Sequence, residues 1–212
     1  MKKRALLTDL GNVLVTFWER ADLAKTIVDR FSGDASAVQE VFPSNLGKGE
    51  DLYEAIDNGS LDFASFHRKI CEAAGITLSY DRFIMLWAQH LKIIEPVANL
   101  YRVIQDRIPI IAVSNGEIGS RHAADLVQVN GGINFLEVFV SAERRLKKPE
   151  LFGLVREFLE SHGFDPEECP YVDDISKYIE GARGFGFSGI LFNGRNDSIE
   201  VLQQALARFG IK

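Results

Sequence analysis

The sequence predicts an α/β protein in which helices cover both faces of a parallel sheet and a small helical bundle is inserted after the first strand. Two observations support this prediction. Short, predominantly apolar runs alternate with amphipathic helical patterns, which is typical of parallel strands buried on both faces. The stretch from about residue 18 to residue 94 holds helical patterns but no clear strand run.

Five apolar runs are predicted to form the strands of the sheet. Each run is followed by a polar residue that begins a turn or a helix. In chain order, the runs are residues 5–8, 108–113, 135–140, 171–172 and 189–192.

Amphipathic helices are predicted between and after these strands. Apolar residues at helical spacing follow Pro96 and Pro149, and proline is favoured in the first turn of a helix. A further helix is predicted from Asp197, which forms a capping-box pattern with Glu200, as far as Gly210.

The insert is predicted to be a domain of its own. One helical stripe of apolar residues begins after Ser60, a suitable N-cap, and a second surrounds Trp87. Glycines between the stripes mark the breaks. We therefore expect a core of residues 1–16 and 95–212 and a helical domain of residues 17–94.

Length and composition are those of a globular chain. Its 212 residues are 46% hydrophobic and 25% charged, which excludes a disordered or fibrous chain. A chain of this size can bury enough surface to be stable without a disulfide or a structural metal. Cys71 and Cys169 have no C-x-x-C spacing, so we expect free thiols in a reducing cytosol.

Net charge argues against a nucleic-acid partner, and the length of the apolar runs argues against a signal peptide or a membrane span. The net charge of −6 does not favour a nucleic acid, and residues 15–95 carry most of the acidic excess. The first apolar run is interrupted by Thr8 and Asp9, which makes it too short for a signal peptide, and no run is long enough to span a membrane. We expect a cytoplasmic protein; the oligomeric state is not predicted.

Polar residues that can carry chemistry stand where three of the predicted strands end. Asp9 follows the first strand, Ser114 and Asn115 follow the second, and Asp173 and Asp174 follow the fourth. Ligands of open parallel sheets bind outside the carboxyl ends of the strands. We therefore expect these side chains to converge on one edge.

The types of these residues predict Mg²⁺-assisted phosphoryl transfer. Converging carboxylates repel one another unless a cation lies between them, and Mg²⁺ prefers oxygen ligands. An aspartate can attack phosphorus, and a lysine such as Lys148 can hold it ionised and offset phosphoryl charge. Ser114 and the N–H groups of the helix that follows it can bind phosphate oxygens.

Four segments give the chain a resemblance to the haloacid dehalogenase-like (HAD) hydrolases. These are Leu7–Leu14 (Leu-Thr-Asp-Leu-Gly-Asn-Val-Leu), Ala112–Gly116, Arg145–Glu150 and Tyr171–Asp174. Their order and spacing fit, and the resemblance covers essentially the whole chain. The Asp-Leu-Gly-Asn-Val motif is similar to that of sugar-phosphate phosphatase-like members. The family implies a Rossmann-like core and a helical cap that closes over the site.

The resemblance implies a nucleophile and a metal site. Asp9 would be both the nucleophile and a ligand of Mg²⁺. Gly11 would add a backbone carbonyl to the metal, Asp174 would bind it directly, and Asp173 would lie beside it.

The resemblance also implies how the substrate, a small phosphorylated metabolite, is held. Ser114 and the backbone of Asn115, together with Gly116, would bind the phosphoryl group. Lys148 would be the catalytic lysine of the motif, in preference to its neighbour Lys147.

Two positions depart from the family pattern. Most of its phosphatases carry a general-acid aspartate where this chain has Gly11, and such help is typically worth about 10²–10⁴ in rate. We therefore expect substrates with good leaving groups, such as anomeric sugar, acyl or aryl phosphates. The alternative is that a residue of the cap, such as Glu19, supplies the proton. Tyr178 replaces an Asp or Asn that orients metal-bound water, which predicts roughly tenfold weaker metal binding.

Three alternative functions are weighed. A 2-haloacid dehalogenase of the same fold needs no metal, but Asp173 and Asp174 would repel its carboxylate substrate. A phosphate-accepting receiver domain uses similar residues in the reverse order and lacks such an insert. A catalytically weak phosphate-binding protein would be consistent with Gly11 and Tyr178.

Overall fold

The architecture is taken from a computed structural model of the chain. It describes residues 3–16, 26, 55–56, 58–89, 91–116 and 118–211. Glu19 and most of the first half of the predicted insert lie outside these residues.

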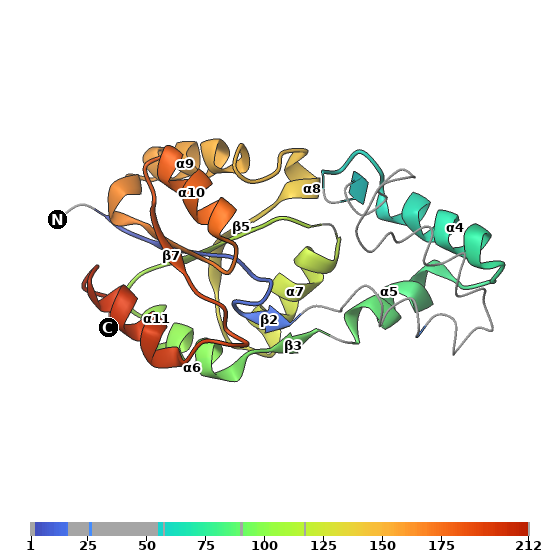
Figure 1. The fold of residues 1–212 in the computed structure, drawn as a ribbon, viewed down its shortest axis with the longest axis horizontal. Helices are drawn as coiled ribbons and strands as arrows, with labels where there is room; N and C mark the ends of the chain where they lie inside the picture. Colours follow the sequence, from blue (N-terminus) through green and yellow to red (C-terminus); the bar gives the residue numbers. More distant parts are fainter. Residues whose placement is uncertain are drawn as a thin grey trace.

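Within the described residues, five parallel strands form the central sheet, in the order β5-β4-β1-β6-β7 (Figure 1). Each predicted strand is present, with its ends moved by at most two residues. The strands are β1 (Leu6–Thr8), β4 (Ile110–Ser114), β5 (Phe135–Val140), β6 (Pro170–Asp173) and β7 (Ser188–Leu191). β1 lies at the centre, pairing with β4 on one side and β6 on the other.

Helices cover both faces of the sheet, which confirms the predicted fold class. Alternate strand residues point to opposite faces, so Leu6 belongs to one apolar core and Leu7 to the other. The Leu6 side packs against α6 (Glu95–Ile104), α7 (Ile118–Val129) and α11 (Ile199–Ala207). The Leu7 side packs against α9 (Leu151–Ser161) and α10 (Ser176–Gly184). The short helices α8 (Ser141–Arg144) and η1 (Pro166–Glu168) connect the larger elements.

Two helices in the described part of the insert, α4 (Phe63–Ala74) and α5 (Tyr80–Ala88), share an apolar core of their own. They enclose an aromatic cluster in which ring centroids lie 5.0–6.2 Å apart. The predicted N-cap was wrong. The carboxylate of Asp62, not Ser60, accepts from the backbone N–H of Ser65, because the hydroxyl of Ser60 donates to the carbonyl of Ala55.

A short antiparallel ribbon joins the insert to the core. β2 (Val15–Thr16) pairs with β3 (Lys92–Ile93), although no strand was predicted between residues 18 and 94. Two-residue strands carry no alternation pattern, and only the pairing of distant segments creates them.

The predicted capping box at the last helix was also wrong. α11 begins after Ser198, whose side chain makes no cap hydrogen bond. The carboxylate of Asp197 instead accepts from the backbone N–H of Asn193 at 2.7 Å and closes the preceding loop. Both cysteines are free thiols, as predicted. Among the described helices, none is long and apolar enough to cross a membrane.

One glycine brings the insert against the core. Gly59 has a φ of +73°, and a Cβ added to it would lie 2.5 Å from the carbonyl oxygen of Ala142 in α8. Gly75 has a similar φ of +64° with no other atom within 4 Å of such a Cβ. Both glycines therefore need a positive φ, but only Gly59 lies against the core.

These glycines provide a matched test of how the insert docks. Gly59→Ala and Gly75→Ala should both destabilise the protein by roughly 1–2 kcal/mol because of the positive φ. Gly59→Ala should cost about 1–3 kcal/mol more, since the methyl group meets the backbone of Ala142. Urea denaturation of both variants measures the difference. Equal costs would show that the insert does not rest on α8.

Candidate functional site

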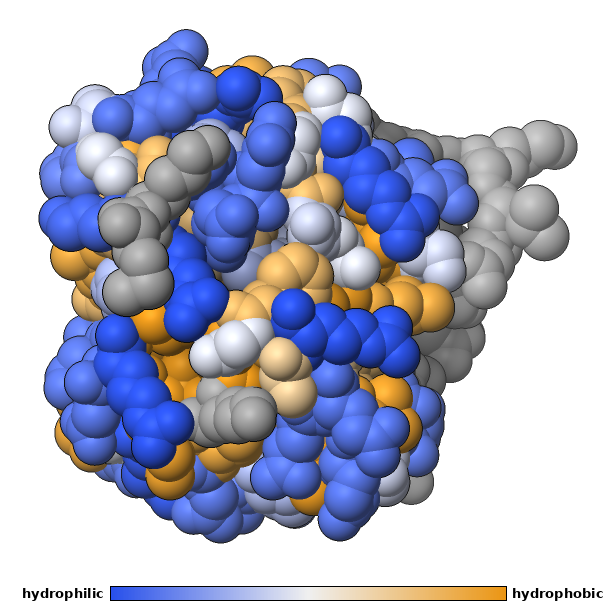
Figure 2. All heavy atoms as spheres, turned by 90° about the vertical axis from the view of Figure 1, so that its left-hand side faces the viewer, coloured by the Kyte–Doolittle hydropathy of each residue, from blue (hydrophilic) through white to orange (hydrophobic). Residues whose placement is uncertain are grey.

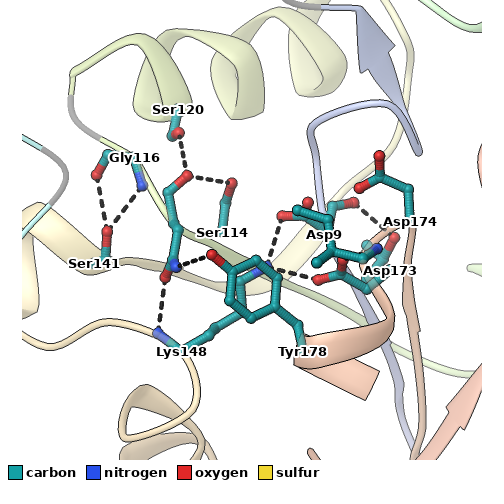
Figure 3. A network of polar contacts seen from close by, with 12 residues as sticks. Asp9, Ser114, Gly116, Ser120, Ser141, Lys148, Asp173, Asp174 and Tyr178 are labelled. Carbon is teal, nitrogen blue, oxygen red and sulfur yellow. Dashed lines mark hydrogen bonds and ion pairs between the residues drawn. The ribbon is translucent and has the colours of Figure 1, made fainter. Parts of the chain in front are cut away.

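Side chains from three strands meet at the carboxyl edge of the sheet (Figure 3). Asp9 follows β1, Ser114 ends β4, and Asp173 ends β6 with Asp174 directly after it. Lys148, from the loop before α9, reaches into the same place. The structure thus brings together residues that are far apart in the sequence.

Asp9 is held by the sheet, with one oxygen unsatisfied. Its backbone N–H donates to the carbonyl of Val172 at 2.8 Å. Its carbonyl accepts from the hydroxyl of Thr8, which in turn accepts from the hydroxyl of Tyr101. Among the described residues, Asp9 Oδ1 has no hydrogen-bond partner although it is buried. Lys148 Nζ lies 3.3 Å from it, as an ion pair without hydrogen-bond geometry.

Lys148 is a buried cation with several partners. Its Nζ lies 2.7 Å from Asp173 Oδ2 and 2.8 Å from the hydroxyl oxygen of Tyr171. The ring of Tyr178 lies over the ammonium, with its centroid 4.5 Å away. Burial alone would lower the pKa of Lys148, but Asp9 and Asp173 outweigh it and raise the pKa. The lysine therefore stays charged at neutral pH.

Both carboxylate oxygens of Asp173 accept hydrogen bonds from within the protein. Its Oδ1 accepts from the backbone N–H of Ile175 at 2.8 Å. Its Oδ2 accepts from Lys148 and from the hydroxyl of Tyr171. With the side chain fully buried, this carboxylate orients Lys148.

Asp174 is half-buried and is held by two asparagines. Its Oδ2 accepts from Asn12 Nδ2 at 3.1 Å and from Asn193 Nδ2 at 3.4 Å. Burial raises the pKa of Asp174, and the negative charge of Asp173 adds to this.

The three carboxylates form a site suited to a hard cation. Asp9, Asp173 and Asp174 each offer an oxygen, and these oxygens lie within 4.8 Å of one another. Burial raises the pKa of Asp9 to about 7, with Asp173 and Asp174 adding to the rise and Lys148 opposing it. One lysine does not offset three carboxylates. The orphan oxygen of Asp9 and the all-oxygen donor set fit Mg²⁺.

The loop after β4 provides the other side of the site. Ser114 is buried, and its hydroxyl donates to the carbonyl of Asn115 at 3.3 Å. The side chain of Asn115 accepts from the backbone N–H of Lys148 at 2.8 Å and donates to the hydroxyl of Tyr178 at 3.1 Å. This amide therefore ties the lysine loop and α10 to the end of β4.

Gly116 links the loop after β4 to α8. Its N–H donates to Ser141 Oγ at 2.8 Å, and its carbonyl accepts from the hydroxyl of Ser141 and from the N–H of Ala142. These hydrogen bonds fasten the loop to α8, and the predicted contact of Gly116 with a phosphoryl group stays a prediction.

The sequence reading missed several residues of this site. Ser141 and Asn193 carry no motif signal, since only the packing of distant segments brings them to the site. Tyr171 stands in the fourth motif, but only the structure shows that its hydroxyl contacts Lys148 and Asp173. Asn12 belongs to the first motif, and a polar side chain beside the predicted nucleophile is a signal that could have identified it. Tyr178 was noticed as a departure, but its contacts with Asn115 and Lys148 were not foreseen.

A hollow lies away from this site, at the end of the molecule that faces the viewer in Figure 2. It has a volume of about 670 Å³ and is lined by Lys3, Arg4, Arg107, Ile108, Pro109, Leu136, Phe164 and Glu168. Among these residues there is one carboxylate, and no serine, cysteine or aspartate. The carboxyl edge of the sheet therefore remains the candidate active site.

Comparison with known proteins identifies the fold. No family model matches the chain. A HAD family enzyme from Bacteroides thetaiotaomicron, solved in complex with magnesium and inorganic phosphate, is 21% identical with a TM-score of 0.70, and the match covers 93% of this chain and 97% of that one. A predicted HAD-like hydrolase from Porphyromonas gingivalis is 17% identical with a TM-score of 0.72, over 97% and 98% of the two chains.

A dehalogenase shares the fold at a lower score. The L-2-haloacid dehalogenase from Xanthobacter autotrophicus, solved with chloropropionic acid covalently bound, is 20% identical with a TM-score of 0.58, over 100% of this chain and 85% of that one. The chain therefore has the fold of the HAD family enzymes, as the four motifs predicted.

The raised pKa of Asp9 predicts how its replacement affects stability in chelator. Because the folded-state pKa of about 7 exceeds the ordinary value of 3.8, folding takes up a proton between these pH values. The stability that this carboxyl contributes is complete below about pH 4 and is lost as the pH rises through 7. Asp9→Asn should therefore match the wild type near pH 4 and exceed it by about 1–4 kcal/mol at neutral pH.

Urea denaturation at several pH values measures this difference, and Mg²⁺ is then added. The cation should stabilise the wild type more than Asp9→Asn, because it binds the folded carboxylates. A stability difference that does not change with pH would contradict the assigned charge balance.

Proposed function

We propose that the chain, which has the fold of the HAD family enzymes, is a Mg²⁺-dependent phosphatase that acts on a small phosphorylated metabolite. The observation that carries this proposal is the buried Oδ1 of Asp9, which accepts no hydrogen bond from the described residues and lies between a buried lysine and two further carboxylates. The complex of a structural neighbour with magnesium and inorganic phosphate supports it. A sugar phosphate is the substrate class that the first motif favours.

Asp9 and Asp174 would hold the metal, with the backbone carbonyl of Gly11. Asp173 lies within reach of the same position, but its bonds to Lys148, Tyr171 and Ile175 favour an orienting role. When bound, Mg²⁺ supplies positive charge that offsets the phosphoryl oxygens and keeps Asp9 ionised.

Asp9 Oδ1 is the proposed nucleophile. It attacks phosphorus, the bond between phosphorus and the leaving oxygen breaks, and that oxygen takes up a proton. Water then attacks the phosphorus of the aspartyl-phosphate, losing its proton to solvent, and inorganic phosphate leaves with Asp9 restored. Lys148, Ser114 and the backbone of Asn115 would bind the phosphoryl oxygens in both steps.

The cap completes the proposal. We assign residues 17–94 to it, and its contact with α8 places it near the loop that Gly116 and Ser141 fasten. Closure of a cap excludes bulk water while the covalent intermediate exists. We further propose a cytoplasmic location, no nucleic-acid or membrane partner, and a single phosphate on the substrate, because a nearly neutral core with an acidic insert disfavours polyanions.

A dehalogenase is the second candidate, and the neighbour with covalently bound chloropropionic acid favours it. In that reaction an aspartate attacks carbon, and the substrate is itself a carboxylate. Asp173 and Asp174 place negative charge beside Asp9, which disfavours such a substrate.

Metal dependence and the nucleophile are tested together. With Mg²⁺, the protein should hydrolyse members of a panel of sugar, acyl and aryl phosphates, and chelator should abolish the turnover. Asp9→Asn should lower kcat by at least about a thousandfold, whereas the exposed Asp106→Asn should not. Turnover of 2-haloacids that is indifferent to chelator would favour the dehalogenase. No turnover of any compound would favour a phosphate-binding protein.

The absence of a side chain at Gly11 predicts a dependence on the leaving group. Aryl phosphates should be hydrolysed at least about 100-fold faster than matched primary alkyl phosphates, since the former need little protonation. The ratio of kcat/KM values measures this. Equal kcat/KM values for the aryl and alkyl phosphates would overturn the leaving-group prediction. If Glu19→Gln then lowered only the rate on alkyl phosphates, the proton donor would be assigned to the cap.

A further inference from the structure

Asp174 lies between two asparagines that come from different strand ends. Asn12 follows β1, Asn193 follows β7, and Asp174 follows β6, the strand that separates them in the sheet. Both side-chain amides donate to the same atom, Asp174 Oδ2, at 3.1 and 3.4 Å. The carboxylate is therefore held from both sides.

The donors are neutral, and this matters for the charge of the site. A lysine or arginine at either position would orient Asp174 but would also neutralise it. Two amides restrict the carboxylate and leave its negative charge available to a cation. Lys148, by contrast, forms ion pairs with Asp9 and Asp173 and so offsets part of their negative charge.

The orientation of the Asn193 amide is determined by its own loop. Its Oδ1 accepts from the backbone N–H of Arg195 at 3.0 Å, so its Nδ2 is the end that reaches Asp174. Its backbone N–H is held by the carboxylate of Asp197. The turn therefore presents a donor, and not an acceptor, to the carboxylate.

The loop that carries Asn193 is fastened to the loop that carries Asn12. The N–H of Gly194 donates to the carbonyl of Asn12 at 2.6 Å. A Cβ on Gly194 would lie 2.5 Å from the carbonyl oxygen of Val13, so only glycine permits this approach. Asn12 itself has a φ of +52°, a conformation that asparagine tolerates better than most residues.

We propose that Asn12 and Asn193 are positioning residues that set the affinity of the site for a divalent cation by holding Asp174. The role rests on the proposed function, in which Asp174 is a metal ligand.

The test measures Mg²⁺ binding by isothermal titration calorimetry, independently of turnover. Asn12→Gly removes one amide and keeps the positive φ, and Asn193→Ala removes the other. Each should raise the Kd for Mg²⁺ by about tenfold or more. Asn196→Ala, an exposed asparagine of the same loop as Asn193, should leave the Kd unchanged. The loss of turnover in the two positioning variants should shrink as Mg²⁺ is raised to saturation, because the reacting groups are intact.

A second route to the same result keeps both amides in the chain. Gly194→Ala forces the two loops apart and should raise the Kd as well, whereas Gly184→Ala, where an added Cβ meets no other atom within 4 Å, should not. Thermal unfolding in chelator checks that each variant is folded.

The outcomes separate the two proposals. A wild type that binds Mg²⁺ while Asn12→Gly and Asn193→Ala bind it equally well overturns the positioning role and leaves the proposed function standing. A wild type that shows no Mg²⁺ binding overturns the proposed metal-dependent function, and the positioning role with it.

Discussion

The site depends on the burial of one ammonium group between carboxylates. Lys148 is only 4% exposed, and a lone charge at that depth would be neutral. Asp9 and Asp173 keep the lysine charged, and its positive charge offsets part of their negative charge. The remaining excess rests on Asp9 and Asp174, which is why the arrangement is suited to a cation and to a phosphoryl group together.

This charge arrangement requires the topology of the sheet. β1 lies between β4 and β6, so the residues that follow these three strands share one edge although they are distant in the sequence. The outer strand β7 adds Asn193 to the same edge, and the loop before α9 adds Lys148. Around them, Tyr171, Tyr178 and Asn115 link the lysine to β6, α10 and β4. A site assembled from so many elements stays in place because the two apolar cores below it hold the strands.

The strands and the main site residues could be predicted because their signals are local. A run such as residues 108–113 is apolar throughout, and the polar residues Ser114 and Asn115 directly after it stand out against it. The wrong predictions concern helix caps, where several neighbouring polar side chains could make the same hydrogen bond. Asp62 replaced Ser60 as a cap, and Asp197 closed a loop instead of a helix. At Gly116, the hydrogen bond from its N–H to Ser141 was likewise not predictable, because no local pattern records it.

By itself, the sequence determined the fold class, the order of the strands along the chain and the convergence of Asp9, Ser114 and the Asp173–Asp174 pair on one edge. These follow from hydrophobic patterning and from the geometry common to all parallel sheets. Only the tertiary structure decided which carboxylate oxygens are occupied and which are open. Asp173 accepts hydrogen bonds on both oxygens, whereas Oδ1 of Asp9 accepts none from the described residues. This difference depends on the positions of atoms such as Tyr171 Oη and Lys148 Nζ. Their positions are set by packing across the whole sheet, which no local pattern records.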